Sequence, residues 1–214
     1  MYYALMRKCI ALLFCGALAF SATACNKDDG IITEDEMPYG ATMAVNLDDY
    51  ILPVQYDYRF ITEDMLDVIT RYYYAIQTQN DELFQEVQFP LYHDYQLNEV
   101  LDGEYTDQVI LENTHKAITE FNEGDFAFSF IDITDAEKGK EYTTSATLLE
   151  IMDSLSEEKD GTKISKKIKH FYELTITRYV ADAGSNMKGE TNKALQGEKL
   201  FVFQCEDKWY ILYC

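Results

Sequence analysis

The segment Leu91–Tyr95, directly after Pro90, carries the side chains of this chain best suited to proton transfer. Histidine is the residue type most often used for proton transfer, and a carboxylate beside it, as Asp94 is beside His93 in the sequence, is the usual partner. Residues adjacent in sequence usually point in different directions, so two unconnected side chains are the alternative. We therefore take His93 and Asp94 as the candidate catalytic residues, should the protein be an enzyme.

Four tyrosines are candidates for the lining of a ligand pocket. Tyr72 and Tyr73 lie on the inward side of a segment with helical periodicity, while Tyr92 and Tyr95 flank the candidate histidine. Core packing is the simpler role for such rings, and a cavity in which their hydroxyl groups meet a ligand is the functional alternative.

The other two histidines, His115 and His170, do not complete a metal site in the sequence. Glu112 and His115 have the spacing at which one helix presents two metal ligands, but a dinuclear centre needs a second such pair. On a strand, His170 is expected to be half-buried and hydrogen-bonded, with a general base as the alternative. Nucleophile elbows, glycine-rich phosphate loops and paired-cysteine motifs are absent. We predict no metal and no cofactor.

The N-terminus reads as a targeting signal. Arg7 and Lys8 precede a twelve-residue apolar run, and small residues follow it up to Ala24, which is the layout of a secretory signal peptide over residues 1–24. Such a run rises only about 18 Å as a helix, too little for a bilayer core of about 30 Å. The sequence ATAC at residues 22–25 resembles the lipobox of bacterial lipoproteins, although leucine is usual where Ala22 stands. The resemblance implies lipid attachment at Cys25; ordinary cleavage that leaves Cys25 unmodified is the alternative.

Charge restricts the class of partner. The 214 residues carry 18 Lys and Arg against 38 Asp and Glu, a formal charge of -20, which argues against binding to nucleic acid. Without Arg7 and Lys8, 16 basic residues face the 38 acidic ones, a formal charge of -22. Anionic lipid headgroups repel such a body, so the lipid at Cys25 would be its attachment to the membrane. We expect an extracytoplasmic protein that is lipid-anchored to the bacterial cell membrane.

The periodicity of the mature chain predicts an acidic tether over residues 25–36 and a single α+β domain over residues 37–214. Apolar residues at three- and four-residue steps predict helices, and two-residue alternation predicts strands. The expected helices cover residues 62–78, 80–89, 107–122 and 144–156, with Thr62 and Thr106 as caps and Phe121 facing inward. The expected strands cover residues 52–60, 126–134, 168–180, 199–205 and 208–214, with Pro53 favouring a sheet edge for the first. In the last two strands, Cys205 and Cys214 are expected to be free, partly buried thiols.

Helices followed by an antiparallel sheet indicate an α+β fold. The segment ITRYYYAIQTQNDELFQEVQFPLY resembles the opening of the nuclear-transport-factor-two-like superfamily, and the closing FVFQCEDKWYILYC is similar to its last two strands. This resemblance implies N-terminal helices packed on a curved antiparallel sheet that form a cone with a pocket, residues 144–156 being an insertion. Members of the superfamily include enzymes, ligand binders and interaction modules, so the fold implies a cavity but no chemistry.

Two functions from different classes remain open. The first is a non-enzymatic surface lipoprotein whose domain binds a small-molecule ligand or a protein partner that the sequence leaves unidentified. The second is a small enzyme with the cone-shaped fold that uses His93 or Asp94 in a tyrosine-lined pocket. The positions of these two side chains relative to a cavity discriminate between them.

Overall fold

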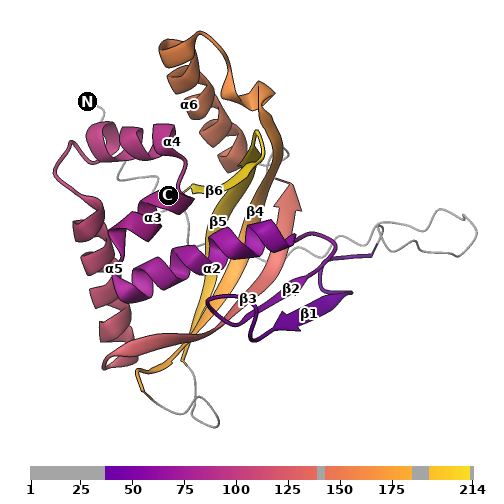
Figure 1. The fold of residues 1–214 in the computed structure, drawn as a ribbon, viewed down its shortest axis with the longest axis vertical. Coiled ribbons are helices and arrows are strands. Elements are labelled where there is room, and N and C mark those ends of the chain that lie inside the picture. The colour runs from indigo at the N-terminus through magenta and orange to yellow at the C-terminus, as the bar shows by residue number, and fades with distance from the viewer. Residues whose placement is uncertain (1–36, 139–142, 185–192, 213–214) are drawn as a thin grey trace, which may run out of the picture. The chain divides into compact units, whose positions relative to one another are not determined.

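This computed structural model describes residues 37–138, 143–184 and 193–212 (Figure 1). The expected signal peptide, the tether, Cys25 and Cys214 lie outside these residues. Residues Met37–Cys214 form one compact unit. Its α+β architecture agrees with the expected class.

A six-stranded sheet organises the domain, with its strands in the order β1-β2-β3-β4-β5-β6. Their bounds are β1 Met43–Asn46, β2 Val54–Asp57, β3 Phe126–Lys138, β4 Ile168–Asp182, β5 Lys193–Cys205 and β6 Lys208–Leu212. Strands β2 and β3 run parallel, while the other neighbours are antiparallel. The expectation of a purely antiparallel sheet is therefore wrong. The reason lies in the chain between β2 and β3, because a connection that contains several helices allows two strands to pair in parallel.

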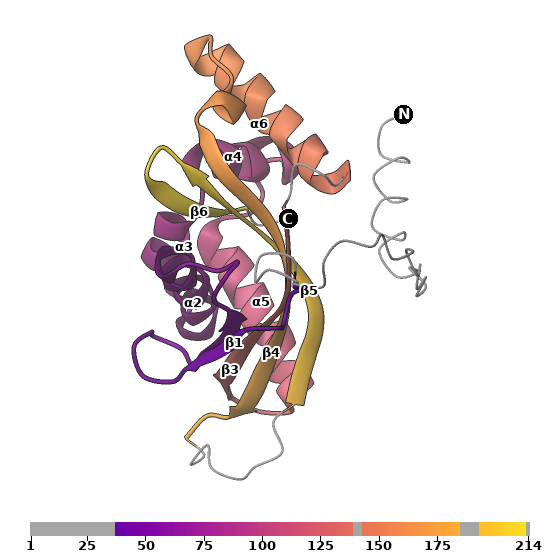
Figure 2. The same ribbon diagram turned by 90° about the vertical axis from the view of Figure 1, so that its right-hand side faces the viewer.

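Three helices pack on the inner face of this sheet: α2 Glu63–Thr78, α3 Asp81–Val87 and α5 Asp107–Asn122. Figure 1 shows α2 crossing the strands, and Figure 2 shows α2 and α3 on one side of the long strands. The predicted caps are confirmed, because the hydroxyl oxygens of Thr62 and Thr106 accept hydrogen bonds from the N–H groups of Met65 and Val109. The apolar stripe of α2 is buried as its spacing predicts, which anchors the main core.

A second core lies on the opposite, outer face of β4, β5 and β6. It is covered by α4 Pro90–Tyr95 and by α6 Thr143–Asp160. Phe171, Phe201 and Phe203 face this core, whereas Leu200 and Val202 face the main core. Both faces of the terminal hairpin are therefore buried, each against different helices.

Several sequence expectations need correction. The strand expected over residues 52–60 is confined to β2, and β1 forms earlier in the chain, where no strand was expected. Pro53 does not mark a sheet edge, because β1 pairs outside β2. The carbonyl of Pro53 instead accepts a hydrogen bond from the N–H of Ile131. Phe121 is exposed rather than inward, near the end of α5, with the Lys193 ammonium 6.0 Å from its ring centroid. The helix expected over residues 144–156 extends to Asp160.

Candidate functional site

The chain between α4 and α5 forms a pocket together with α5. Pro90 is the first residue of α4, a position at which the backbone N–H has no partner within the helix, so its absence removes no hydrogen bond. The helix continues directly into a π-helical segment, η2 Gln96–Val100. The segment ends in a tight reversal in which Asp102 and Gly103 have left-handed backbone angles, φ 53° and 66°. The N–H of Gly103 donates to the carbonyl of Leu97 over 2.9 Å, which fixes this reversal.

The helical pocket, as we name it, has a volume of about 400 Å³ and lies between η2 and α5. It is lined by Gln96, Val100, Leu101, Tyr105, Ile110, Asn113 and Thr114. Val100 and Tyr105 are large apolar side chains exposed at its surface, and none of the lining residues carries a charge. An apolar wall with a few amide and hydroxyl groups is typical of sites for small molecules.

The polar groups of the pocket differ in what they offer a ligand. The Thr114 hydroxyl donates to the Ile110 carbonyl at 2.8 Å, so its oxygen retains a free acceptor site. Among the described residues, the exposed Asn113 amide makes no hydrogen bond and can both donate and accept. The pocket is therefore suited to a neutral group that pairs with an amide.

Behind the pocket wall, three polar side chains join α3, α4 and α5; His93 and Asp107 are buried, and Gln85 is exposed. His93 Nε2 lies 2.9 Å from Asp107 Oδ1, and the Gln85 amide donates to Asp107 Oδ2 over 2.5 Å. The side chains of His93 and Asp107 are only 11% and 6% exposed. His93 is three residues before Gln96, and Asp107 three before Ile110, so the trio supports the two helical segments that form the pocket.

The proposed catalytic pair does not form as the sequence suggested. Asp94 is exposed, and the carboxylate that meets His93 belongs to Asp107, fourteen residues later in the chain. Neither His93 nor Asp94 lines the helical pocket. In the sequence, Asp107 is only the first residue of the helix expected over residues 107–122. Its contact with His93 depends on how two helices pack, and no spacing in the sequence predicts that packing.

The four candidate tyrosines lie in two different cores. Tyr72 and Tyr73 are buried in the main core, where the Tyr73 hydroxyl donates to Glu198 Oε2 at 3.0 Å. Burial, followed by the Glu198 carboxylate, raises the pKa of Tyr73 well above its usual value. Tyr92 belongs to the second core, and Tyr95 packs against it from the edge. The four rings do not share a cavity, and the tyrosine found at the helical pocket is Tyr105.

A smaller pocket of about 180 Å³ lies between the start of α2 and the inner face of the sheet. Its walls are Thr62, Asp64, His170, Tyr172, Gln204 and Trp209. The ring planes of His170 and Trp209 are nearly parallel, at 16°, with their centroids 6.0 Å apart. His170 is exposed, so the expectation that it is half-buried is wrong; its ring lies at the surface in this shallow pocket, beside the buried Trp209.

The third pocket, of about 280 Å³, lies beside the β5–β6 turn and contains Cys205 in its lining. This thiol is free and buried, as predicted for it. Burial, and then the charge of Glu206, raises the pKa of the Cys205 thiol, which disfavours the reactive thiolate. The pocket therefore has no activated nucleophile at this position.

Potential metal ligands are dispersed over the described residues. No group of three or more His, Cys, Asp or Glu side chains gathers there in a way that would hold a metal ion. The Glu112 carboxylate accepts a hydrogen bond from Gln108, and His115 lies beside Thr119, so these two do not face a common site. Within the same residues, no helix is long and apolar enough to cross a membrane.

Comparisons with known proteins assign no role to these pockets, so we infer the function from the residues that line them. No protein-family model, no curated protein and no solved structure matches this chain.

Proposed function

We propose that this protein is an extracytoplasmic lipoprotein, anchored through lipid at Cys25, whose domain binds a neutral, mainly apolar small molecule in the helical pocket. The observation that carries the binding proposal is the composition of this pocket. Apolar side chains make its wall, amide and hydroxyl groups make its polar edge, and no charged group lines it although the chain as a whole is strongly acidic. In this proposal the domain is a variant of the nuclear-transport-factor-two-like cone, with the pocket among its helices.

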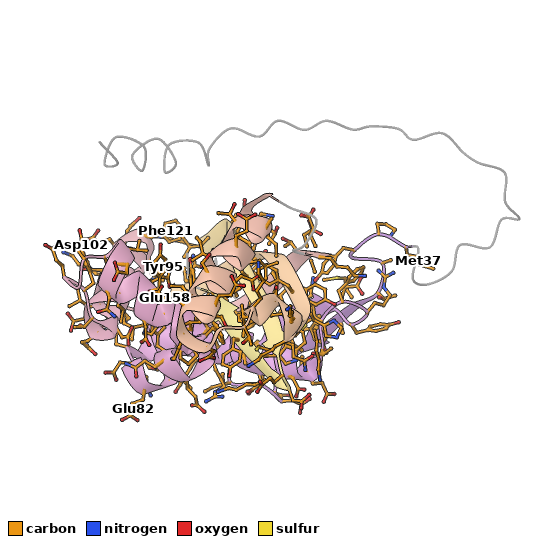
Figure 3. All side chains as sticks on the ribbon, turned by 90° about the horizontal axis from the view of Figure 1, so that it is seen from above. Met37, Glu82, Tyr95, Asp102, Phe121 and Glu158 are labelled. Atoms are coloured by element: carbon orange, nitrogen blue, oxygen red, sulfur yellow. The ribbon has the colours of Figure 1, made fainter. Side chains whose placement is uncertain are left out.

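The position of the pocket suits a tethered binding protein. In Figure 3, Met37, where the described chain begins, and Asp102, in the reversal beside the pocket, lie at opposite ends of the domain. The pocket thus lies at the end of the domain opposite the residue at which a tether would enter, which leaves its mouth accessible to a ligand in the surrounding medium.

Ligand binding is tested with a neutral and a charged probe of the same length, octanamide and octanoate. We expect octanamide to raise the melting temperature of the full-length protein and octanoate to have a much smaller effect, since the walls offer no cation to a carboxylate. A probe present at one hundred times its Kd stabilises a protein by about 2.7 kcal/mol.

Asn113→Trp places a large ring in the mouth of the pocket and should abolish the response to octanamide. Glu112→Trp is the matched control, because Glu112 is the exposed neighbour on the same helix and does not line the pocket. Equal responses of the two variants would contradict binding at this site.

The anchor is tested separately by Cys25→Ala. This variant should lose labelling by a radioactive fatty acid and release the domain from membranes, because the thiol is the only group of the lipobox-like segment able to form the thioether. Normal labelling of the variant would overturn the anchor while leaving the pocket proposal intact.

A further inference from the structure

The free edge of the sheet carries an exposed apolar surface that the proposed function does not use. We name it the β1 edge patch; it consists of Met43, Val45, Leu47, Ile51 and Tyr58, all of them exposed. Val45, on the outermost strand, is 55% exposed. β1 is the last strand of the sheet order, so no described strand pairs with its outer side (Figure 1).

Among the described residues, no backbone group pairs with β1 on this side. The carbonyl of Thr42 accepts a hydrogen bond from the N–H of Tyr58, so Thr42 is directed toward β2. Because successive residues of a strand alternate in the direction of their backbone groups, the N–H and C=O of Met43 and Val45 point to the open edge. Such an edge is a template for another strand.

The devices that usually protect an edge are mostly missing here. Protected edges carry charged side chains or proline within the strand, but residues 37–47 contain no charged residue and the strand itself contains no proline. The shortness of β1 is the one protective feature. In a chain with a formal charge of -20, an uncharged edge is the place where two identical molecules can approach with the least repulsion.

We infer that the occupant of this edge is a second copy of the same chain, joined by antiparallel pairing of β1 with β1. The directions of the backbone groups select one register. Met43 of each copy lies opposite Val45 of the other, and Ala44 lies opposite Ala44 on a two-fold axis. Four backbone hydrogen bonds form, and the small Ala44 side chains occupy the position where opposed residues approach most closely.

This register is also compatible with the charges nearby. Met43 and Val45 from both copies form one apolar cluster, because both side chains point to the same face of β1. Asp48 lies opposite Gly40 of the other copy, so the acidic loops that follow β1 in the two copies do not face each other. The interface is thus self-complementary, as a two-fold dimer requires.

The two copies would build a continuous twelve-stranded sheet, six strands from each. The pairing is a weak interaction, because four residues a side bury less area than stable dimers do. Attachment of both copies to one membrane would raise their effective concentration and favour pairing. The pairing itself depends neither on the ligand nor on the lipid.

The test is a disulfide across the two-fold axis in the full-length protein. In Ala44→Cys, the opposed Cα atoms lie about 4.5 Å apart, within the range that a disulfide spans. We expect mild oxidation to yield a covalent dimer on a non-reducing gel. Leu47→Cys is the control, since residue 47 is also exposed but lies three positions from the axis, and its yield should be at least about tenfold lower.

A second variant tests the hydrogen bonds themselves. Val45→Pro removes an N–H that points to the open edge, so it leaves the β1–β2 ladder intact while blocking the pairing of two copies. Added to Ala44→Cys, it should lower the dimer yield about tenfold with little change in melting temperature. Equal cross-linking at residues 44 and 47, or none at residue 44 in a normally folded variant, would overturn the proposal. In the latter case, the preceding segment 25–36 or another molecule occupies the edge.

Discussion

His93 Nε2 and Asp107 Oδ1 lie 2.9 Å apart in the junction of three helices, and the second oxygen of the same carboxylate accepts the Gln85 amide. Asp107 thus joins α5 to α3 through the hydrogen bond from Gln85 and to α4 through its close contact with His93. It also lies in the first turn of α5, where a negative charge stabilises the helix. One side chain therefore fixes the mutual position of the elements around the helical pocket.

Asp107→Ala should lower the free energy of unfolding by about 2–4 kcal/mol. The substitution removes the carboxylate that faces the buried Nε2 of His93, and an unsatisfied buried group costs about 1–3 kcal/mol. It also removes the acceptor of the exposed Gln85 amide. Urea denaturation at neutral pH measures the change. Asp94→Ala is the control, because Asp94 is exposed and its removal should cost no more than about 0.5 kcal/mol. Equal effects would show that the Asp107 contact contributes nothing.

The stability of the β1–β2 region should depend on pH through Asp57. Its side chain is fully buried, and although burial alone raises its pKa, hydrogen bonds from Arg59, Thr42 and Gly40 hold the pKa of Asp57 well below its usual range. Such a depressed pKa contributes stability that is complete above about pH 4 and is lost as the pH falls below it.

Asp57→Ala should accordingly cost about 3–5 kcal/mol at pH 7, since the Arg59 guanidinium is left buried without its counter-ion. The difference between wild type and variant should shrink as the pH is lowered from 7 to 2. Guanidinium denaturation at several pH values measures this difference. A difference that is independent of pH would show that folding does not lower the pKa of Asp57.

Residue types and their spacing within one segment are enough to predict α2. Met65, Ile69 and Tyr73 recur at helical spacing, and Thr62 precedes two acidic residues, so the start and the buried side of α2 follow from the sequence. The alternation around Phe203 likewise identified the terminal hairpin, which the register of β5 and β6 confirms. In both cases, residues close together in the sequence determine the element and its buried side.

Features that depend on distant residues were not predicted. The parallel pairing of β2 with β3 joins Val54 to Ile131 across five helical segments, and β1 is too short to produce a clear alternation. In α4, Tyr92 and His93 face different partners, the second core and Asp107, so the helix has no single apolar stripe. The helical pocket depends on the π-helical segment and on its left-handed reversal, which propensities alone do not indicate.

Tyr73→Phe should lower the free energy of unfolding by about 1.5–3 kcal/mol, because it removes a buried hydrogen bond to a carboxylate. The Tyr73 hydroxyl joins the long helix to Glu198 on β5, and Arg178 stabilises the same carboxylate at 2.7 Å. Tyr74→Phe is the control on the same helix, because Tyr74 is only partly buried. Equal costs for the two variants, measured by thermal unfolding, would contradict a specific role for the Glu198 contact.

Phe203→Ala should cost about 3–5 kcal/mol, the usual range for a large aromatic side chain removed from a core. Phe203 is fully buried in the second core, where its ring lies 5.2 Å from that of Phe89 and 6.0 Å from that of Phe171. The residue therefore connects the terminal hairpin to the segment before α4 and to β4. A large share of the stability of a typical domain, about 5–15 kcal/mol, is then at risk from one substitution.

The matched control is Tyr210→Phe, which keeps a ring beside Phe203 and changes only a hydroxyl group. This control should remain within about 1 kcal/mol of the wild type in chemical denaturation. Because Phe203 and Val202 face different cores, Val202→Ala should also destabilise the protein, and the effects of the two truncations should add approximately. A folded, cooperative Phe203→Ala variant of nearly wild-type stability would show that the outer face of the hairpin is not a core, and that α4 and α6 do not cover it in solution.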